Sequence, residues 1–240
     1  MRYGWRARIG QIRPSTGIES SEEWRSVAPD GVAFIDARTM VKTVDERGLE
    51  EMMEQVVFEA QKCASARADV IVQCGTPGVF LRGKGYDAVV IAEMEKASGV
   101  KCTTMMTAMQ EAMRALGMTK IALGSTYVSH VNAKMKAYLE DLGFAVPAVK
   151  GLEQLDPAEC MELEPEAAYE LGRDVFAEAK GADGVVLSCA GMRTFEVIDA
   201  LETGTGVPVV TSNQAALWQA LRLAGIEDRI PKLGRLFREH

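Results

Sequence analysis

Short apolar runs alternate with longer amphipathic stretches along the whole chain. Each run has the length and continuous hydrophobicity of a strand that is buried on both faces of a parallel sheet. We predict such strands at residues 9–12, 32–35, 70–72, 121–123, 185–187 and 207–210. Apolar residues at helical spacing predict helices at 45–67, 86–98, 107–116, 131–142, 165–180 and 214–223. This alternation predicts an α/β fold with parallel sheet.

The two halves of the chain resemble each other. Residues 8–12 match 120–124, residues 68–75 match 182–189, and residues 99–104 match 206–211. Because the three blocks occur in the same order at nearly the same spacing, we infer two similar lobes, each a short parallel sheet flanked by helices. The expected lobes are residues 1–116 and 117–240, and the last helix of each half is expected to cross over to the other lobe.

The repeat also predicts where a ligand would bind. In open parallel sheets, ligands bind beyond the carboxyl ends of the strands. Two facing lobes would bring four such ends to one cleft, at residues 13–15, 74–77, 125–127 and 188–191. We therefore expect the active site in the cleft between the lobes.

Composition narrows the chemistry. The formal net charge of −7 argues against a nucleic-acid partner. The chain has 5 Cys and 2 His, and His240 is its last residue, so we expect no histidine-based metal site and no bound metal. The odd number of cysteines, without a CxxC pair, predicts free thiols and a cytoplasmic location. We expect no signal peptide, because no long uncharged apolar segment follows the N-terminal arginines. We expect no membrane span, because no apolar run approaches about 18 residues.

One cysteine stands out by position. Cys189 lies in a turn of small residues directly after a predicted strand, where backbone N–H dipoles favour a reactive thiolate. Cys74 lies one position before the repeat partner of Cys189 and should point to the opposite side of its strand, so burial is favoured for it. Cys63, Cys102 and Cys160 are expected to be structural.

Two further side chains at strand ends have open interpretations. Tyr127 would either donate its hydroxyl to an anion or line the lobe interface as a half-buried aromatic residue. Arg13 would either clamp a substrate carboxylate or lie exposed on the surface.

The chain resembles the aspartate/glutamate racemase superfamily, most closely arylmalonate decarboxylase and next the maleate cis-trans isomerases. The resemblance covers nearly the whole chain and rests on the duplicated lobes, the strand-end Pro14 and the turns around Gly75 and Cys189. Its other motifs are at Arg8-Ile9-Gly10, Phe80 with Arg82 and Gly83, Cys102-Thr103-Thr104-Met105, Arg114-Ala115-Leu116-Gly117, Ala122-Leu123 with Tyr127, Val207-Pro208-Val209-Val210 and Gly234-Arg235-Leu236-Phe237.

The resemblance implies roles for individual residues. Racemases and isomerases of the superfamily use one cysteine from each lobe, whereas this chain has Gly75 at the first position, as decarboxylase-like members do. The resemblance therefore makes Cys189 the proton donor to an enediolate. It makes Thr76, Tyr127 and the N–H groups around Gly75, Thr76, Ala190 and Gly191 a hole that binds a carboxylate, beside Pro14.

The chain also departs from the family pattern. Pro77 replaces a serine that donates to the hole, Ala190 replaces a glycine, and Arg13 stands beside the pocket where a small apolar residue is expected. Ser15 with Thr16 is closer to the pattern of maleate isomerases. We include Cys74, Arg13 and Ser15 as a second set of candidate site residues. The departures favour a dicarboxylate more polar than an arylmalonate.

The resulting hypothesis is an enzyme without a cofactor that decarboxylates a malonate-type substrate, with Cys189 protonating one face. The alternatives are cis-trans isomerisation of the maleate isomerase kind and racemisation of an amino or hydroxy acid, for which Cys74 is the nearest second thiol. A remoter alternative is a non-catalytic protein that binds a small carboxylate. The expected partner is a small carboxylate or dicarboxylate, and the sequence leaves a homo-oligomer open.

Overall fold

The computed structural model describes residues 2–43 and 45–240. The strands are β1 (Ala7–Pro14), β2 (Val32–Thr39), β3 (Val70–Gln73), β4 (Lys101–Thr104), β5 (Lys120–Ser125), β6 (Ala145–Gly151), β7 (Gly184–Ser188) and β8 (Val209–Thr211). The α-helices are α1 (Glu19–Val27), α2 (Glu46–Met53), α3 (Val56–Ser65), α4 (Thr76–Phe80), α5 (Tyr86–Ser98), α6 (Met105–Ala115), α7 (Ser129–Asp141), α8 (Pro165–Glu178), α9 (Ile198–Thr205), α10 (Ser212–Leu223) and α11 (Gly234–Glu239). Two short 3₁₀ turns are η1 (Glu159–Met161) and η2 (Pro231–Leu233). Within the described ranges, none of the helices combines the length and apolar character that crossing a membrane requires.

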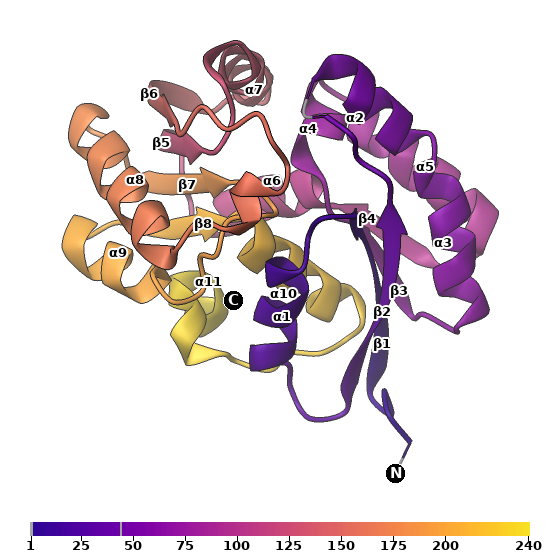
Figure 1. The fold of residues 1–240 in the computed structure, drawn as a ribbon. Helices are drawn as coiled ribbons and strands as arrows, with labels where there is room; N and C mark the ends of the chain where they lie inside the picture. The colour runs from indigo at the N-terminus through magenta and orange to yellow at the C-terminus, as the bar shows by residue number, and fades with distance from the viewer. Residues whose placement is uncertain (1, 44) are drawn as a thin grey trace.

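The strands form two parallel sheets with the same internal order. The first sheet has the order β2-β1-β3-β4, and the second has β6-β5-β7-β8. All pairings within both sheets are parallel. In Figure 1 the first sheet lies among the indigo and magenta helices and the second among the orange and yellow ones. The predicted α/β fold with two similar lobes is confirmed, and the shared strand order matches the repeat in the sequence.

The sequence pattern did not predict two strands, β4 and β6, because each lies at the edge of a sheet and contains both polar and apolar residues. β4 is Lys-Cys-Thr-Thr, and β6 alternates between exposed and buried positions at its start before ending half-buried. An edge strand has one neighbour and needs no continuous apolar run. The helix predicted over 45–67 is in fact two helices, α2 and α3. The break comes beside Gln55, whose side chain pairs with both backbone groups of Met40.

The last helix of each repeat begins at a capping threonine. The Thr104 hydroxyl accepts a hydrogen bond from the N–H of Thr107 at the start of α6, and Thr211 forms a capping box with Gln214 at the start of α10. α6 and α10 pack on each other, α6 contacts β8 and α10 contacts β3 and β4. The lobe boundary after residue 116 stays a prediction.

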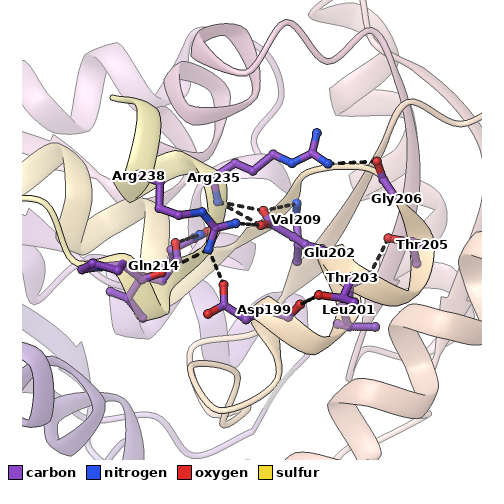
Figure 2. A network of polar contacts seen from close by, with 12 residues as sticks. Asp199, Leu201, Glu202, Thr203, Thr205, Gly206, Val209, Gln214, Arg235 and Arg238 are labelled. Atoms are coloured by element: carbon purple, nitrogen blue, oxygen red, sulfur yellow. Dashed lines mark hydrogen bonds and ion pairs between the residues drawn. The ribbon is translucent and has the colours of Figure 1, made fainter.

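A buried carboxylate fastens the C-terminal segment to the second lobe. Glu202 on α9 is 4% exposed and accepts hydrogen bonds from the backbone N–H groups of Val209 and Arg235 (Figure 2). Arg238 donates to Glu202 and to Asp199. These bonds hold α11 against α9 and the start of β8, so the chain end is part of the fold.

Candidate active site

A pocket lies where the strands of both sheets end, and it takes residues from all four predicted strand ends. Together with the solvent at its open mouth, the space that it encloses is about 500 Å³. The residues that the four ends contribute are Pro14, Gly75, Thr76, Pro77, Thr126, Tyr127, Cys189, Ala190 and Gly191, and Thr16 follows the first end. The structure thus gathers Cys189 and each residue that we assigned to substrate binding around one pocket.

The remaining wall comes from two segments in equivalent places of the two repeats. Val41, Leu49 and Met52 follow β2, and Pro157, Cys160 and Met161 follow β6. The sequence pattern does not reveal them, because β6 lacks a continuous apolar run and residues 156–166 have the polar composition of a solvated surface. A search for the repeat partner of β2 would have found β6. Most of these side chains are apolar, so this part of the pocket disfavours charge.

Cys189 directly follows β7 and is 7% exposed. The N–H of Gly191 donates to its Sγ at 3.3 Å, and its own N–H donates to Ser212 Oγ at 3.2 Å. The neighbouring Cys160 thiol, foremost, and the N–H of Gly191 lower the pKa of Cys189 to about 7, although burial opposes this. The thiol is therefore poised between its two protonation states near neutral pH.

A hydroxyl cluster crosses the lobe interface beside Cys189. Thr76 Oγ1, at the start of α4 in the first lobe, lies 2.6 Å from Tyr127 Oη and 3.3 Å from Ser188 Oγ in the second. Tyr127 is buried, and burial raises the pKa of its phenol well above the usual value, so the hydroxyl stays protonated and can donate. Its ring packs against Phe80 with the centroids 5.9 Å apart. Tyr127 is thus buried, not half-buried, at the lobe interface, and it also lines the pocket. Donation of its hydroxyl to an anion stays a prediction.

The backbone behind Tyr127 is tied down by a neighbouring helix. Asn132 on α7 donates to the carbonyl oxygen of Tyr127 at 2.8 Å and accepts from Ser125 Oγ at 2.6 Å. The Ser125 hydroxyl in turn accepts from the N–H of Tyr127. These bonds fix the turn after β5 and hence the direction of the phenol.

Gly75 occupies the place in the first lobe that Cys189 has in the second. Its φ of −160° is extended backbone, which any residue adopts. A Cβ atom there would come within 2.9 Å of Gln73 Nε2 and 3.2 Å of Met52 Cε, both ends of flexible side chains. Backbone strain therefore does not require a glycine at this position. A side chain there would instead press on the ends of Gln73 and Met52 beside the pocket.

The second set of candidates lies outside the pocket wall. Cys74 is fully buried, with its Sγ directed to the carbonyl oxygen of Val72 at 3.7 Å, and burial raises the pKa of its thiol. Ser15 uses its hydroxyl to accept from the N–H of Val41, which holds the segment after β2. Neither side chain lines the pocket.

Arg13 fits neither interpretation offered by the sequence. It is fully buried, its Nε donates to Gln11 Oε1 at 2.7 Å, and its guanidinium carbon lies 4.5 Å from the ring centroid of Trp24. Among the described residues its two terminal nitrogens have no hydrogen-bond partner, and burial lowers its pKa. Residues 11 and 13 share one face of β1, where Arg13 packs on Trp24, and Arg13 is not among the residues that line the pocket. The expectation of an arginine beside the substrate is therefore not supported.

Cys160 was expected to be structural, and the structure places it in the wall of the pocket together with Cys189. It is buried, and the neighbouring Cys189 and burial raise the pKa of its thiol. Cys63 and Cys102 lie outside the pocket in the core of the first lobe, where burial raises the pKa of each thiol to about 12. Position in the fold, not residue type, separates Cys160 from the other two.

A carboxyl group of the first lobe holds the loop that follows Cys189. Glu23 on α1 accepts from the N–H groups of Thr194 and Phe195, and its other oxygen accepts from Asn213 Nδ2 at 2.7 Å. The same Asn213 amide donates to the carbonyl oxygen of Ala190 at 3.2 Å. Figure 1 shows α1 lying beside α10, against the second lobe. Glu23 thereby connects the lobes directly behind the turn that carries Cys189.

This carboxyl group should make stability depend on pH. Burial raises the pKa of Glu23 from 4.5 to about 7, so between these values the folded protein binds more protons than the unfolded chain, and stability falls as pH rises. We expect the free energy of unfolding of the wild type, relative to Glu23→Gln, to drop by about 3 kcal/mol from pH 4.5 to pH 7.5. Urea denaturation across this range measures it. Glu22→Gln, at an exposed neighbour, should follow the wild type, and parallel curves for Glu23→Gln and wild type would contradict the assignment.

Comparison with known proteins agrees with this architecture. A family model described as arylmalonate decarboxylase matches residues 9–237. Arylmalonate decarboxylase of Bordetella bronchiseptica is 33% identical over 233 residues, covering 96% of each chain, and maleate isomerase of Nocardia farcinica is 26% identical over 242 residues, covering 97% of this chain and 96% of that protein. A solved structure of a doubly substituted arylmalonate decarboxylase in a liganded form matches with a TM-score of 0.92 at 31% identity, covering 98% of this chain and 100% of that one. The resemblance found in the sequence is thus confirmed, and the chain belongs to the arylmalonate decarboxylase family.

Proposed function

We propose that this protein is a decarboxylase for a malonate-type substrate with an apolar substituent, and that the reaction needs no cofactor. The observation that carries the proposal is the pairing of one thiol of near-neutral pKa, Cys189, with a glycine, Gly75, at the equivalent position of the other lobe. Family membership supports the reaction class.

One carboxylate of the substrate would bind at the hydroxyl cluster. Thr76 and Tyr127 supply hydroxyl donors, and the turns at Gly75 and Ala190 bring backbone groups to the same place. The N–H of Gly191 is already directed to Cys189 Sγ, so in this proposal it serves the thiol instead of the substrate. Donors fixed before the reaction stabilise the charge that develops on the carboxylate as it becomes an enediolate.

The other carboxylate would face the apolar wall. Leu49, Met52 and Met161 offer no hydrogen bonds there, which favours conversion of the charged group into neutral carbon dioxide. As the carbon–carbon bond breaks, its electron pair moves into the enediolate. This wall is apolar, and Arg13 is not part of it. We therefore favour a substrate with an apolar substituent over the more polar dicarboxylate that the sequence suggested.

Cys189 would then complete the reaction. Its proton passes from Sγ to the α-carbon, which leaves a thiolate that solvent reprotonates. Because Gly75 carries no acid and Cys74 lies outside the pocket wall, protonation comes from one face and yields one enantiomer. A racemase-like mechanism would need a second acid or base opposite Cys189, and the first lobe offers no ionisable side chain in the described part of this pocket.

A cis-trans isomerase of the maleate type is the second candidate. The lowered pKa of Cys189 favours it specifically, because attack on a double bond requires the thiolate. The two candidates therefore use opposite protonation states of the same sulfur atom.

The test is a substrate panel of aryl- and alkylmalonates and maleate, assayed in deuterated water and across pH. For a decarboxylase we expect carbon dioxide release, one deuterium at the α-carbon of a single enantiomer, and a kcat/KM that falls as pH rises through about 7, since the thiol form is consumed. Conversion of maleate to fumarate without carbon dioxide release from any malonate, at a rate that rises through pH 7, would replace the proposal with the isomerase.

The proposal extends to the partner and the location of the protein. The partner would be a small carboxylate, and the five cysteines, all free and buried, support a reducing cytoplasmic location.

A further inference from the structure

Cys160 and Cys189 share the pocket although they are far apart in the sequence. Cys160 lies on η1, the turn between β6 and α8, and is 5% exposed. A Cβ atom built on Gly191 would lie 3.4 Å from Cys160 Cβ and 2.2 Å from Met161 Cε, so η1 packs directly on the turn that follows Cys189. The N–H of the same Gly191 donates to Cys189 Sγ at 3.3 Å. The second thiol is thus held against the loop that carries the first.

The surroundings decide which sulfur atom donates. Cys189 Sγ accepts a hydrogen bond from the N–H of Gly191, which favours its thiolate, whereas the neighbouring Cys189, burial and the Asp156 carboxylate raise the pKa of the Cys160 thiol. Of the two thiols, Cys160 is therefore the one that keeps its proton and is able to donate it. Tyr127 is the other titratable group that acts on Cys189, and it remains a neutral phenol.

The described wall of the pocket contains no lysine, arginine or histidine. The hydrogen bond that Cys189 Sγ accepts comes from a neutral donor, the N–H of Gly191, and the Cys160 thiol and the Thr126 hydroxyl are neutral groups of the same pocket. Loss of one donor from so small a set should have a large effect on protonation.

We propose that Cys160 is a positioning residue that donates its S–H to Cys189 Sγ and thereby governs the protonation of that thiol. The consequence for the reaction rests on the proposed function. Because Cys160 stabilises the thiolate of Cys189, it makes the Cys189 thiol a stronger acid, which protonates the enediolate more readily. The protonation equilibrium itself is independent of any substrate.

The experiment titrates the thiol in the intact enzyme. The rate of alkylation of Cys189 by iodoacetamide is measured from pH 5 to pH 10 by mass spectrometry of the modified peptide, in wild type, Cys160→Ala and Cys160→Ser. We expect the midpoint to rise by about one pH unit in Cys160→Ala, equivalent to a roughly tenfold smaller thiolate fraction at pH 6. Cys160→Ser keeps a hydroxyl donor and should fall between the other two.

Cys102→Ala is the matched control, since it removes another buried thiol outside the pocket, and its midpoint should equal that of the wild type. If the alkylation midpoint of folded Cys160→Ala is equal to that of the wild type or lower, the inference is wrong. If the alanine variant does not fold, the midpoint of Cys160→Ser decides in the same way. The pH profile of kcat/KM separates this from the proposed function. If the alkylation midpoint moves and the falling limb of activity does not, Cys160 governs the thiol but Cys189 is not the proton donor.

Discussion

Replacement of Cys189 with alanine should lower kcat by about 10²- to 10⁴-fold, the range that a positioned general acid contributes. The variant retains the hydroxyl cluster of Thr76 and Tyr127, so substrate should still bind and KM should change little. Without the thiol, the enediolate is protonated by water, which reaches both faces. We therefore expect the residual product to lose its enantiomeric excess, as measured by chiral chromatography.

The matched control is Cys63→Ala, which removes a buried thiol from the core of the first lobe. It should keep full turnover and a single enantiomer even if the melting temperature falls. Full turnover by the Cys189→Ala variant would exclude both the decarboxylase and the isomerase mechanisms, because each assigns the chemical step to this sulfur atom.

Replacement of Thr76 with valine should have the second largest effect, a loss of about 10²- to 10³-fold in kcat, as for removal of one oxyanion-hole donor. Valine keeps the branched shape but removes the hydroxyl that contacts Tyr127 and Ser188 across the lobe interface. The charge that develops on the bound carboxylate would lose a donor whose position is fixed in advance. Steady-state kinetics at saturating substrate measures the loss.

Thr103→Val provides the comparison, since Thr103 is a buried threonine at the equivalent end of β4 whose hydroxyl bonds Gln219. It should lower stability without changing kcat. If Thr76→Val raised KM and left kcat unchanged, the hydroxyl would bind substrate and transition state equally, and the assignment of an oxyanion hole would be wrong.

Much of the fold followed from the repeat in the sequence. Buried central strands must be apolar on both faces, so β1, β3, β5 and β7 were recognisable, and the order of the matching blocks predicted two equivalent sheets. Because the ends of parallel strands share one edge of a sheet, the same pattern located Gly75, Thr76, Tyr127 and Cys189 in one cleft.

The residues that the sequence did not reveal lie where no periodicity requires a particular residue. Cys160 follows the unpredicted edge strand β6, in a polar segment typical of a surface loop. Glu23 lies on the polar helix α1, where nothing in the local pattern distinguishes it from its exposed neighbour Glu22. The partners of Glu23 lie more than a hundred residues away, at Thr194 and Asn213. Cys160 meets Cys189, which lies in another loop of the same lobe.

From the sequence alone one could predict the α/β class, the duplication, the edge of the sheets where the pocket lies, and the presence of Cys189 at that edge. These depend on strand periodicity and on residues at strand ends, which are local properties of the chain. Folding is needed to bring Cys160 into the pocket beside Cys189, to bury Arg13 away from the pocket wall, and to place Glu23 against the loop behind Cys189. A thiol's acidity and a carboxyl group's charge depend on burial and on the donors that surround them, and folding brings those donors from distant segments.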